Sequence, residues 1–370
     1  LASGKDPAQI AKRRLDQYTR DPEALVRDLR EAKKDFEAIL AVLGVNVGKT
    51  WGKKEVQLPE RKKYVKYTQN YKSRAIVDFD SAEILVETLD DQDPQKSLKN
   101  AIVTTLLTPQ DPRSVDLFSD KEIVLTDDKE PYLFGLVLDQ RNKPIRSPEE
   151  AEPFAAYLLE KKYATRVVDQ DGTKKTVHYA TMAMVTNLPM KQAEKYRTLV
   201  HQFAQQYNIS PSLVFAVIRT ESNFNPYAVS SAPAYGLMQL VPTSGGREAY
   251  RKAKGQDVIP SRDYLFDPEN NVELGTAFLN VLMFNQLEAV DHNVSREYCV
   301  IAAYNTGAGN VFRTFSRDRT TAVNQINSLQ PAGVYDQLRK NLPYEETRHY
   351  LEKVTGYRKS FVSSSESSNQ

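Results

Sequence analysis

Cysteine, histidine and long apolar runs are all scarce in this chain. Cys299 is the only cysteine among 370 residues, so no disulfide can form within the chain. It lies in the apolar run YCVIAAY, which favours a place in the core over a reactive role. The histidines are scattered without the spacing of metal ligands: His178, His201, His292 and His349. We therefore expect neither a metal nor another cofactor.

Strong net charge is also missing. The formal charge is +2 at pH 7, which gives no reason to expect a nucleic-acid partner unless basic residues gather on one face. No stretch approaches the roughly 18 consecutive apolar residues that cross a bilayer. The hydrophobic content of 40% can supply a sizeable core, and 370 residues suggest two domains.

The first part of the chain, residues 1–190, predicts an α+β domain with an antiparallel sheet. Strand-like runs at 74–80 and 82–89 suggest a hairpin that turns near Asp80 and Ser81. Asp171 and Gly172 are a strong hairpin signal within 163–185, and 131–138 predicts another strand. Helices are expected at 98–107 and at 7–43, the latter with candidate apolar-face positions Ile10, Leu15, Leu25, Leu29, Phe36, Ile39 and Leu43.

The second part, residues 191–359, predicts a mainly α-helical domain. Helices are expected over 195–208, 211–222, 268–287, 295–305 and 343–357. Ser295 is the expected N-cap of the fourth. The low-complexity end of the chain, within 360–370, predicts a disordered tail.

Glu221 is the most informative acidic residue. It closes a predicted helix whose residues 213–218 are all apolar, so this helix is expected to be buried on every side. Desolvation and the negative end of the helix dipole would both raise the pKa of Glu221, as a general acid requires. The alternative is a Glu paired with Arg219 or exposed on the last turn.

Three later strips supply further candidates. In AYGLMQ (234–239), Gly236 would allow close approach of backbone to a ligand, and Gln239 offers a donor and an acceptor. In AAYNTGAG (302–309), a helix ends near Asn305, which would place Tyr304 and Asn305 in a cleft. ETRHYLEKV (346–354) contributes Tyr350. Taken singly, the strips fit ordinary packing, a plain helix end with a buried Tyr, and a surface or core aromatic.

Together the strips carry a family resemblance over residues 191–359. ESNFNPYAVSSAPAYGLMQLVP resembles the first two motifs of family 1 lytic murein transglycosylases: a Glu-Ser pair, Asn-Pro, a Ser nine residues after the Glu, and Gly-Leu-Met-Gln. AAYNTGAG is similar to the third motif and LPYEETRHYLEKV to the fourth. Upstream, the segment 51–80, SVDLFSD and PYLFGLVLD resemble the N-terminal domain of the membrane-bound C type. Pro233 departs from the Gly that the family usually has, which leaves the shape of this loop open.

The resemblance implies a lysozyme-like catalytic domain that acts on peptidoglycan glycan strands, with Glu221 as the catalytic acid and base. It implies substrate contacts from Ser230, Gly236, Met238, Gln239, Tyr304 and Asn305, and it places the Tyr350 hydroxyl near the catalytic carboxylate. Members of this type are envelope lipoproteins with an acylated N-terminal Cys, so we expect a periplasmic protein anchored to the outer membrane in its native form. This chain begins with LASG and has no Cys there, and LASG could be a signal remnant or a cloning scar.

The reaction leaves alternatives open. Most glycosidases pair two carboxylates, but the next acidic residue after Glu221 is Glu248. Folding could instead bring Asp263, Asp267 or Glu269 close, as in a hydrolytic lysozyme. The family implies a single-acid route in which the substrate's acetamido group assists and a 1,6-anhydromuramic acid end forms. A peptidoglycan-binding scaffold without catalysis is the third hypothesis.

The segment 60–74 interleaves tyrosines with basic residues. Tyr64, Tyr67 and Tyr71 lie among lysines and arginines, a pattern that can bind nucleic acid or hold sugar rings and stem-peptide carboxylates. A solvated edge strand whose lysines protect it is the favoured interpretation.

Overall fold

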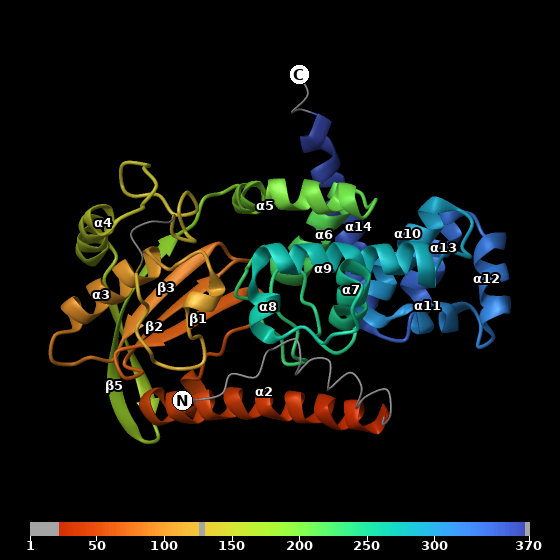
Figure 1. The fold of residues 1–370 in the computed structure, drawn as a ribbon. Coiled ribbons are helices and arrows are strands. Elements are labelled where there is room, and N and C mark those ends of the chain that lie inside the picture. The colour runs from red at the N-terminus through yellow and green to blue at the C-terminus, as the bar shows by residue number, and fades with distance from the viewer. Residues whose placement is uncertain (1–21, 126–129, 367–370) are drawn as a thin grey trace, which may run out of the picture. The chain divides into compact units, whose positions relative to one another are not determined.

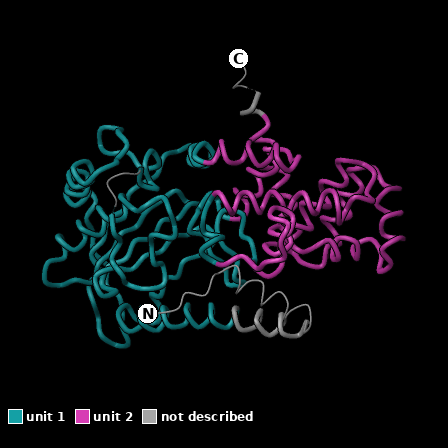
Figure 2. Tube along the Cα trace, in the orientation of Figure 1, with its two compact units in different colours: residues 1–195, 222–241, 262–268 teal, residues 196–221, 242–261, 269–370 magenta. Residues whose placement is uncertain are grey.

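The computed structural model describes residues 22–125 and 130–366, and they form two compact units (Figures 1 and 2). The first unit comprises Leu1–Lys195, Ser222–Val241 and Arg262–Pro268. The second comprises Tyr196–Glu221, Pro242–Ser261 and Glu269–Gln370. Two short segments from the later half of the sequence therefore belong to the same unit as the N-terminal residues.

A five-stranded antiparallel sheet of order β1-β2-β3-β5-β4 organises the first unit (Figure 1). Its strands are β1 (Lys63–Thr68), β2 (Ser73–Asp78), β3 (Glu83–Thr88), β4 (Ala164–Gln170) and β5 (Thr173–Ala183). Both predicted hairpins are confirmed. Asp171 and Gly172 join β4 to β5 with φ values of 49° and 92°, since a two-residue turn that follows the sheet twist needs positive φ at both positions.

Helices pack on both faces of this sheet. Helix α2 (Pro22–Trp51) packs on one face, and α3 (Pro94–Leu106) and α4 (Pro148–Lys161) pack on the other. The unit also contains η1 (Lys53–Glu55), η2 (Pro112–Ser114) and the short α8 (Arg262–Phe266). One core lies between the sheet and α3 and α4, and it includes Phe79, Tyr132 and Tyr227. The second core lies on the α2 side and includes Trp51 and Tyr67.

The helix expected at 7–43 begins in a range that lies outside the described residues. The observed helix α2 ends at Trp51, beyond the expected end at 43. Phe36 and Leu43 are buried as expected, whereas Ile39 is 37% exposed. The strand expected at 131–138 is wrong. Gly135, with φ of 70°, turns the chain there, and the segment makes only isolated bridges.

Strand β1 corrects the interpretation of 60–74. It is an edge strand, but its residues 64–68 are buried rather than solvated. The Lys66 ammonium donates a 2.8 Å hydrogen bond to the Ser119 carbonyl, and burial lowers its pKa to about 8. Tyr64 and Tyr67 lie in the two cores, so their rings are not free to hold sugars or bases.

The later half of the chain is helical, and the α+β class is confirmed. The helices are α5 (Leu188–Gln206), α6 (Pro211–Ser222), α7 (Gly245–Lys254), α9 (Pro268–Val281), the π-helix η3 (Leu282–Gln286), α10 (Asn293–Thr306), α11 (Ala308–Phe315), α12 (Arg319–Ser328), α13 (Pro331–Asn341) and α14 (Glu345–Glu366). His292, not Ser295, caps α10, because its ring nitrogen accepts from the Val294 amide. Helix α14 continues past Tyr357 into the segment expected to be a disordered tail.

Candidate active site

Glu221 lies near the C-terminal end of α6 and is 5% exposed. The apolar residues 213–218 before it are all buried, so the helix is enclosed on every side, as its composition predicts. The alternative of an exposed Glu on the last turn is wrong. The neighbouring Arg219 places its guanidinium 3.9 Å from the centre of the Tyr357 ring, a cation–π contact within the second unit.

Tyr304, on α10, interacts with this carboxylate. Burial raises the pKa of the Tyr304 hydroxyl well above its usual value, and the negative charge of Glu221 raises it further. The phenol is therefore protonated at neutral pH. Its ring packs at 5.4 Å against Phe278 of α9, which fixes the ring plane. Two predicted site residues, from helices far apart in the sequence, are thus brought together.

Asn305 follows Tyr304 on α10 and is oriented by α14. The Thr347 hydroxyl donates a 2.6 Å hydrogen bond to Asn305 Oδ1, which directs the amide nitrogen away from Thr347. Sequence reasoning missed Thr347, although it lies three residues before Tyr350 on the same helix, and that spacing places both on one face. Tyr350 itself is 4% exposed.

The remaining predicted substrate contacts lie on the loop Ser222–Val241, which belongs to the first unit. The Ser222 hydroxyl donates to the Leu237 carbonyl at 2.8 Å, and the Gly236 amide donates to the Ala228 carbonyl at 2.9 Å. Gly236 has φ of 74°, a conformation that favours glycine. These bonds fold the loop back on itself and fix Gly236 to Gln239 relative to its start.

Gln239 uses its amide asymmetrically. Its Nε2 donates two 3.0 Å hydrogen bonds within the loop, to the carbonyls of Ala228 and Gly236, while Oε1 is buried without a partner. The sequence suggested that this side chain offers both a donor and an acceptor, but the structure leaves only the acceptor. A buried polar atom without a partner is costly, which favours a ligand donor at this position.

Two other residues of the loop have internal roles. Met238 is fully buried, so its side chain supports the loop from within. The Ser230 hydroxyl donates to the Ala232 carbonyl. Any contact that either makes with a substrate in this conformation would therefore come from backbone or from a rearranged hydroxyl.

The loop is built onto aromatic residues from the N-terminal part of the chain. The Tyr227 ring lies 5.0 Å from that of Tyr64 and 5.8 Å from that of Tyr132. Farther along, the Tyr235 ring lies 5.7 Å from that of Phe36 and 5.4 Å from that of Phe266. The loop shares its core with residues more than 90 positions away in the sequence.

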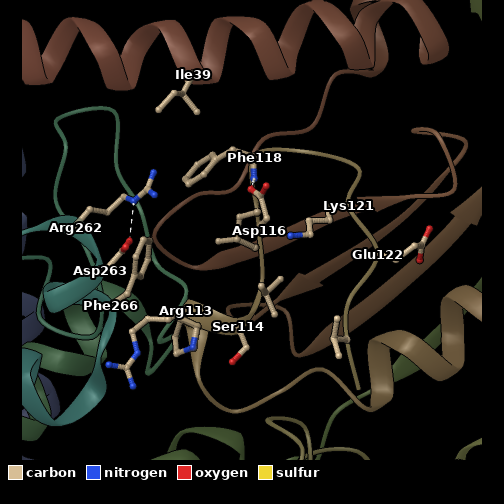
Figure 3. Close-up of a pocket in the computed structure, with 14 residues that line it drawn as sticks. Ile39, Arg113, Ser114, Asp116, Phe118, Lys121, Glu122, Arg262, Asp263 and Phe266 are labelled. Atoms are coloured by element: carbon tan, nitrogen blue, oxygen red, sulfur yellow. Dashed lines mark hydrogen bonds and ion pairs between the residues drawn. The ribbon is translucent and has the colours of Figure 1, made fainter. Parts of the chain in front are cut away.

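The residues considered as a second catalytic carboxylate either form an ion pair or are exposed. Asp267 forms a 3.1 Å ion pair with Arg113 in the first unit. Asp263 is mostly exposed beside Arg262, at the edge of a cavity of about 460 Å³ that Phe118 and Phe266 also line (Figure 3). Glu269 is exposed. None of them has the buried, apolar surroundings of Glu221.

No group of three or more His, Cys, Asp or Glu side chains that could hold a metal ion occurs among the described residues. Likewise, none of the helices in the described part of the chain is long and apolar enough to cross a membrane.

Two family models match adjoining parts of the chain. Residues 26–195 match the N-terminal domain of membrane-bound lytic murein transglycosylase C, and residues 198–327 match the transglycosylase SLT domain. The predicted site residues Glu221, Gln239, Tyr304 and Asn305 fall within the second match, whereas Tyr350 lies beyond it.

Curated relatives match nearly the whole chain. Membrane-bound lytic murein transglycosylase C of Serratia proteamaculans is 42% identical over 92% of this chain and 92% of its own length. The protein of the same name from Klebsiella pneumoniae is 43% identical over 92% of this chain and 91% of its own. Among solved structures, an inactive mutant of the lytic transglycosylase Slt from Pseudomonas aeruginosa is 29% identical, with a TM-score of 0.34, over 44% of this chain and 23% of its own.

Proposed function

Because this chain belongs to the family of membrane-bound lytic murein transglycosylases C and is a peptidoglycan lytic transglycosylase, we propose that it cleaves the β-1,4 bond between N-acetylmuramic acid and N-acetylglucosamine without adding water. The product end would be a 1,6-anhydromuramic acid. The observation that carries the proposal is the buried Glu221 carboxylate in electrostatic contact with the protonated Tyr304 hydroxyl.

In the proposed first step, Glu221 donates its proton to the glycosidic oxygen as the bond from that oxygen to the anomeric carbon breaks. The acetamido oxygen of the same muramic acid attacks the anomeric carbon and forms an oxazolinium ring, which takes the place of a second carboxylate. Glu221 is then an anion, and it removes the proton from the sugar's 6-hydroxyl. That oxygen attacks the anomeric carbon, opens the oxazolinium and closes the anhydro ring.

Three features of the chain support a single acid. Glu221 is buried at the end of an apolar helix, where water has little access. Asp267 forms an ion pair with Arg113, and Asp263 and Glu269 are exposed. None of these carboxylates therefore has the surroundings that would raise its basicity for general-base catalysis. The Tyr304 hydroxyl stays protonated beside Glu221 and can donate to the carboxylate when it is an anion.

The other site groups fit substrate positioning. Asn305 presents an amide donor, because Thr347 holds its oxygen, and Gln239 presents an acceptor, because its nitrogen is held by the loop. An amide donor of this kind suits the carbonyl oxygen of an N-acetyl group, and an acceptor suits the N–H of one. We place Ser230, Gly236, Met238 and Tyr350 among the groups that shape the site around the glycan strand.

We further propose that the protein works in the cell envelope, in the periplasm, and that its native form is anchored to the outer membrane by a lipid. The support is the description "membrane-bound" carried by its relatives. Peptidoglycan strands are the proposed partner, and no nucleic acid is involved.

Mass spectrometry of the products from purified peptidoglycan tests the reaction. We expect muropeptides with 1,6-anhydro ends and no incorporation of ¹⁸O from labelled water. Reducing ends carrying one solvent oxygen per cleavage would instead assign a hydrolytic lysozyme, and no cleavage by the folded protein would favour a binding scaffold.

A further inference from the structure

The turn that directly follows Glu221 has an unfavourable backbone. Asn223 and Phe224 are consecutive residues with φ values of 48° and 62°, in the left-handed region that residues other than glycine seldom adopt. Each such residue costs on the order of 1 kcal/mol or more, and the conformation persists only where the surroundings impose it. Helix α6 ends at Ser222, so this turn determines how the chain leaves the end of the helix that carries Glu221.

The groups that impose the turn come from the N-terminal part of the chain. The Tyr132 hydroxyl donates a 3.1 Å hydrogen bond to the Phe224 carbonyl. The side-chain amide of Asn223 donates to the Phe79 carbonyl at 2.5 Å, and the side-chain amide of Asn225 donates to the Arg61 carbonyl at 3.2 Å. The bonds to the Phe224 and Phe79 carbonyls are buried and so shielded from water, whereas the bond to the Arg61 carbonyl is partly buried.

Tyr132 is itself held from several sides. Its hydroxyl accepts a 3.3 Å hydrogen bond from Gln192, and its ring packs edge-on against Phe79 and Tyr227 at centroid distances of 5.9 and 5.8 Å. The Lys195 ammonium donates to its carbonyl at 2.6 Å. Burial raises the pKa of Tyr132, so the hydroxyl remains a donor. These hydrogen bonds and ring contacts hold the buried Tyr132 side chain in one position.

We propose that Tyr132 is a positioning residue for catalysis: through the strained turn at residues 222–225 it sets the direction of the Glu221 carboxylate. The inference rests on the proposed role of Glu221. Neither residue with positive φ is a glycine, so the hydrogen bonds from the Tyr132 hydroxyl and the Asn223 side-chain amide are needed to hold the turn in this geometry.

The test compares two buried Tyr→Phe variants in the full chain. Tyr67 matches Tyr132 closely: its hydroxyl also donates to a backbone carbonyl, that of Gln57 at 3.0 Å, and accepts from a backbone amide, but it lies in the other core. We expect both Tyr132→Phe and Tyr67→Phe to lower the melting temperature. On soluble muropeptide chains, at a temperature where both are folded, Tyr132→Phe should lower kcat about five- to tenfold with KM within about twofold, whereas Tyr67→Phe should change neither.

A second variant keeps the test decisive if Tyr132→Phe does not fold. Asn223→Gly removes the hydrogen bond from the side-chain amide to the Phe79 carbonyl. Because glycine adopts the left-handed conformation without strain, stability should be largely retained. We expect kcat to fall while the melting temperature changes little. Equal kcat for Tyr132→Phe and Tyr67→Phe, or wild-type kcat for Asn223→Gly, would overturn the positioning role.

A Glu221→Gln variant measured alongside separates this inference from the proposed function. If that variant loses turnover and Tyr132→Phe behaves like Tyr67→Phe, only the positioning role fails. If Glu221→Gln keeps wild-type kcat, the catalytic role of Glu221 falls, and the positioning role falls with it.

Discussion

The Thr347 hydroxyl lies 2.6 Å from Asn305 Oδ1 and donates a hydrogen bond to it, so one side chain of α14 orients the amide of a predicted site residue on α10. With the oxygen occupied, the two N–H groups of Asn305 are the ones available to a ligand. Thr347 is buried, which limits the access of water to this bond from its side.

Replacing Thr347 with Val should remove this orientation at nearly constant volume. We expect kcat/KM on soluble muropeptide chains to fall about fivefold, because a neutral hydrogen bond contributes on the order of 1 kcal/mol. Thr355→Val is the matched control, since its hydroxyl donates to the Leu351 carbonyl on the same helix and reaches no site residue. Equal kinetics for the two variants would remove Thr347 from the site.

Changing Glu221 to Gln should abolish turnover while leaving the fold and glycan binding largely intact. The amide keeps the shape of the side chain but cannot deliver the proton, and general acid–base catalysis contributes roughly 10²–10⁴-fold. Release of muropeptides from purified peptidoglycan measures the loss, and cosedimentation with the same material measures binding. Activity within a few-fold of the unmodified protein would exclude Glu221 as the acid.

A stable thiazoline analogue of the oxazolinium ion should compete for the site, because it imitates the charge and ring of the proposed intermediate. Its binding should weaken by about 1–3 kcal/mol in Gln239→Ala and in Asn305→Ala, where a hydrogen-bonding partner of the ligand is lost. Calorimetric titration measures this. Chitin oligomers, which lack the lactyl ether and the peptide, should be poor substrates even where they bind. Unchanged thiazoline affinity in both variants would contradict substrate assistance at these residues.

Residues 191–359 alone should be inactive on soluble muropeptide chains as well as on intact sacculi. The loop Ser222–Val241 would lose the aromatic packing of Tyr64 and Tyr132 and its bonds to the backbone of Arg61 and Phe79. A fragment that cleaves soluble chains at near full rate and fails only on sacculi would contradict this expectation. It would show that residues 1–190 serve only to bind the enzyme to intact peptidoglycan.

A buried ionic cluster should dominate the stability of the sheet. Arg74 is almost fully buried, lies 3.9 Å from the centre of the Trp51 ring, and bonds Glu87 at 2.6 Å and Glu55 at 3.2 Å. Arg74→Met leaves the buried Glu87 with Arg166 as its remaining partner, so we expect the free energy of unfolding to fall by on the order of 3 kcal/mol at pH 7. Lys62→Met, which breaks the exposed pair with Asp80, should change it by less than about 1 kcal/mol.

The stability that this ionic cluster contributes should depend on pH. The hydrogen bond from Arg166, and then the charges of Arg166 and Arg74, lower the pKa of Glu55 from its ordinary 4.5. A carboxylate with a lowered pKa in the folded state contributes stability above its unfolded value and loses it as pH falls. The difference between the unmodified protein and Arg74→Met in urea unfolding should therefore shrink as pH falls below 4.5. A difference that grows under acid would contradict this assignment.

The sequence by itself determined the local elements. Six apolar residues before Glu221 required a helix buried on every side, and Asp171 with Gly172 required a two-residue hairpin, because both patterns act over a few neighbouring residues. The motif strips, through their family resemblance, predict Glu221, Gln239, Tyr304 and Asn305 as site residues. The local pattern gave no indication that 131–138 turns at Gly135, because a short apolar run fits both a strand and a buried turn.

Tertiary structure decided which partners these residues have. It brought Glu221 to Tyr304 and Thr347 to Asn305, turned the donors of Gln239 inward, and buried the tyrosines of 60–74 in the two cores. It also joined the turn after Glu221 to Tyr132, 92 positions away from Phe224 in the sequence. Such bonds depend on where distant segments meet when the apolar surface is buried, and no local pattern of residues encodes a hydroxyl at position 132 against a carbonyl at position 224.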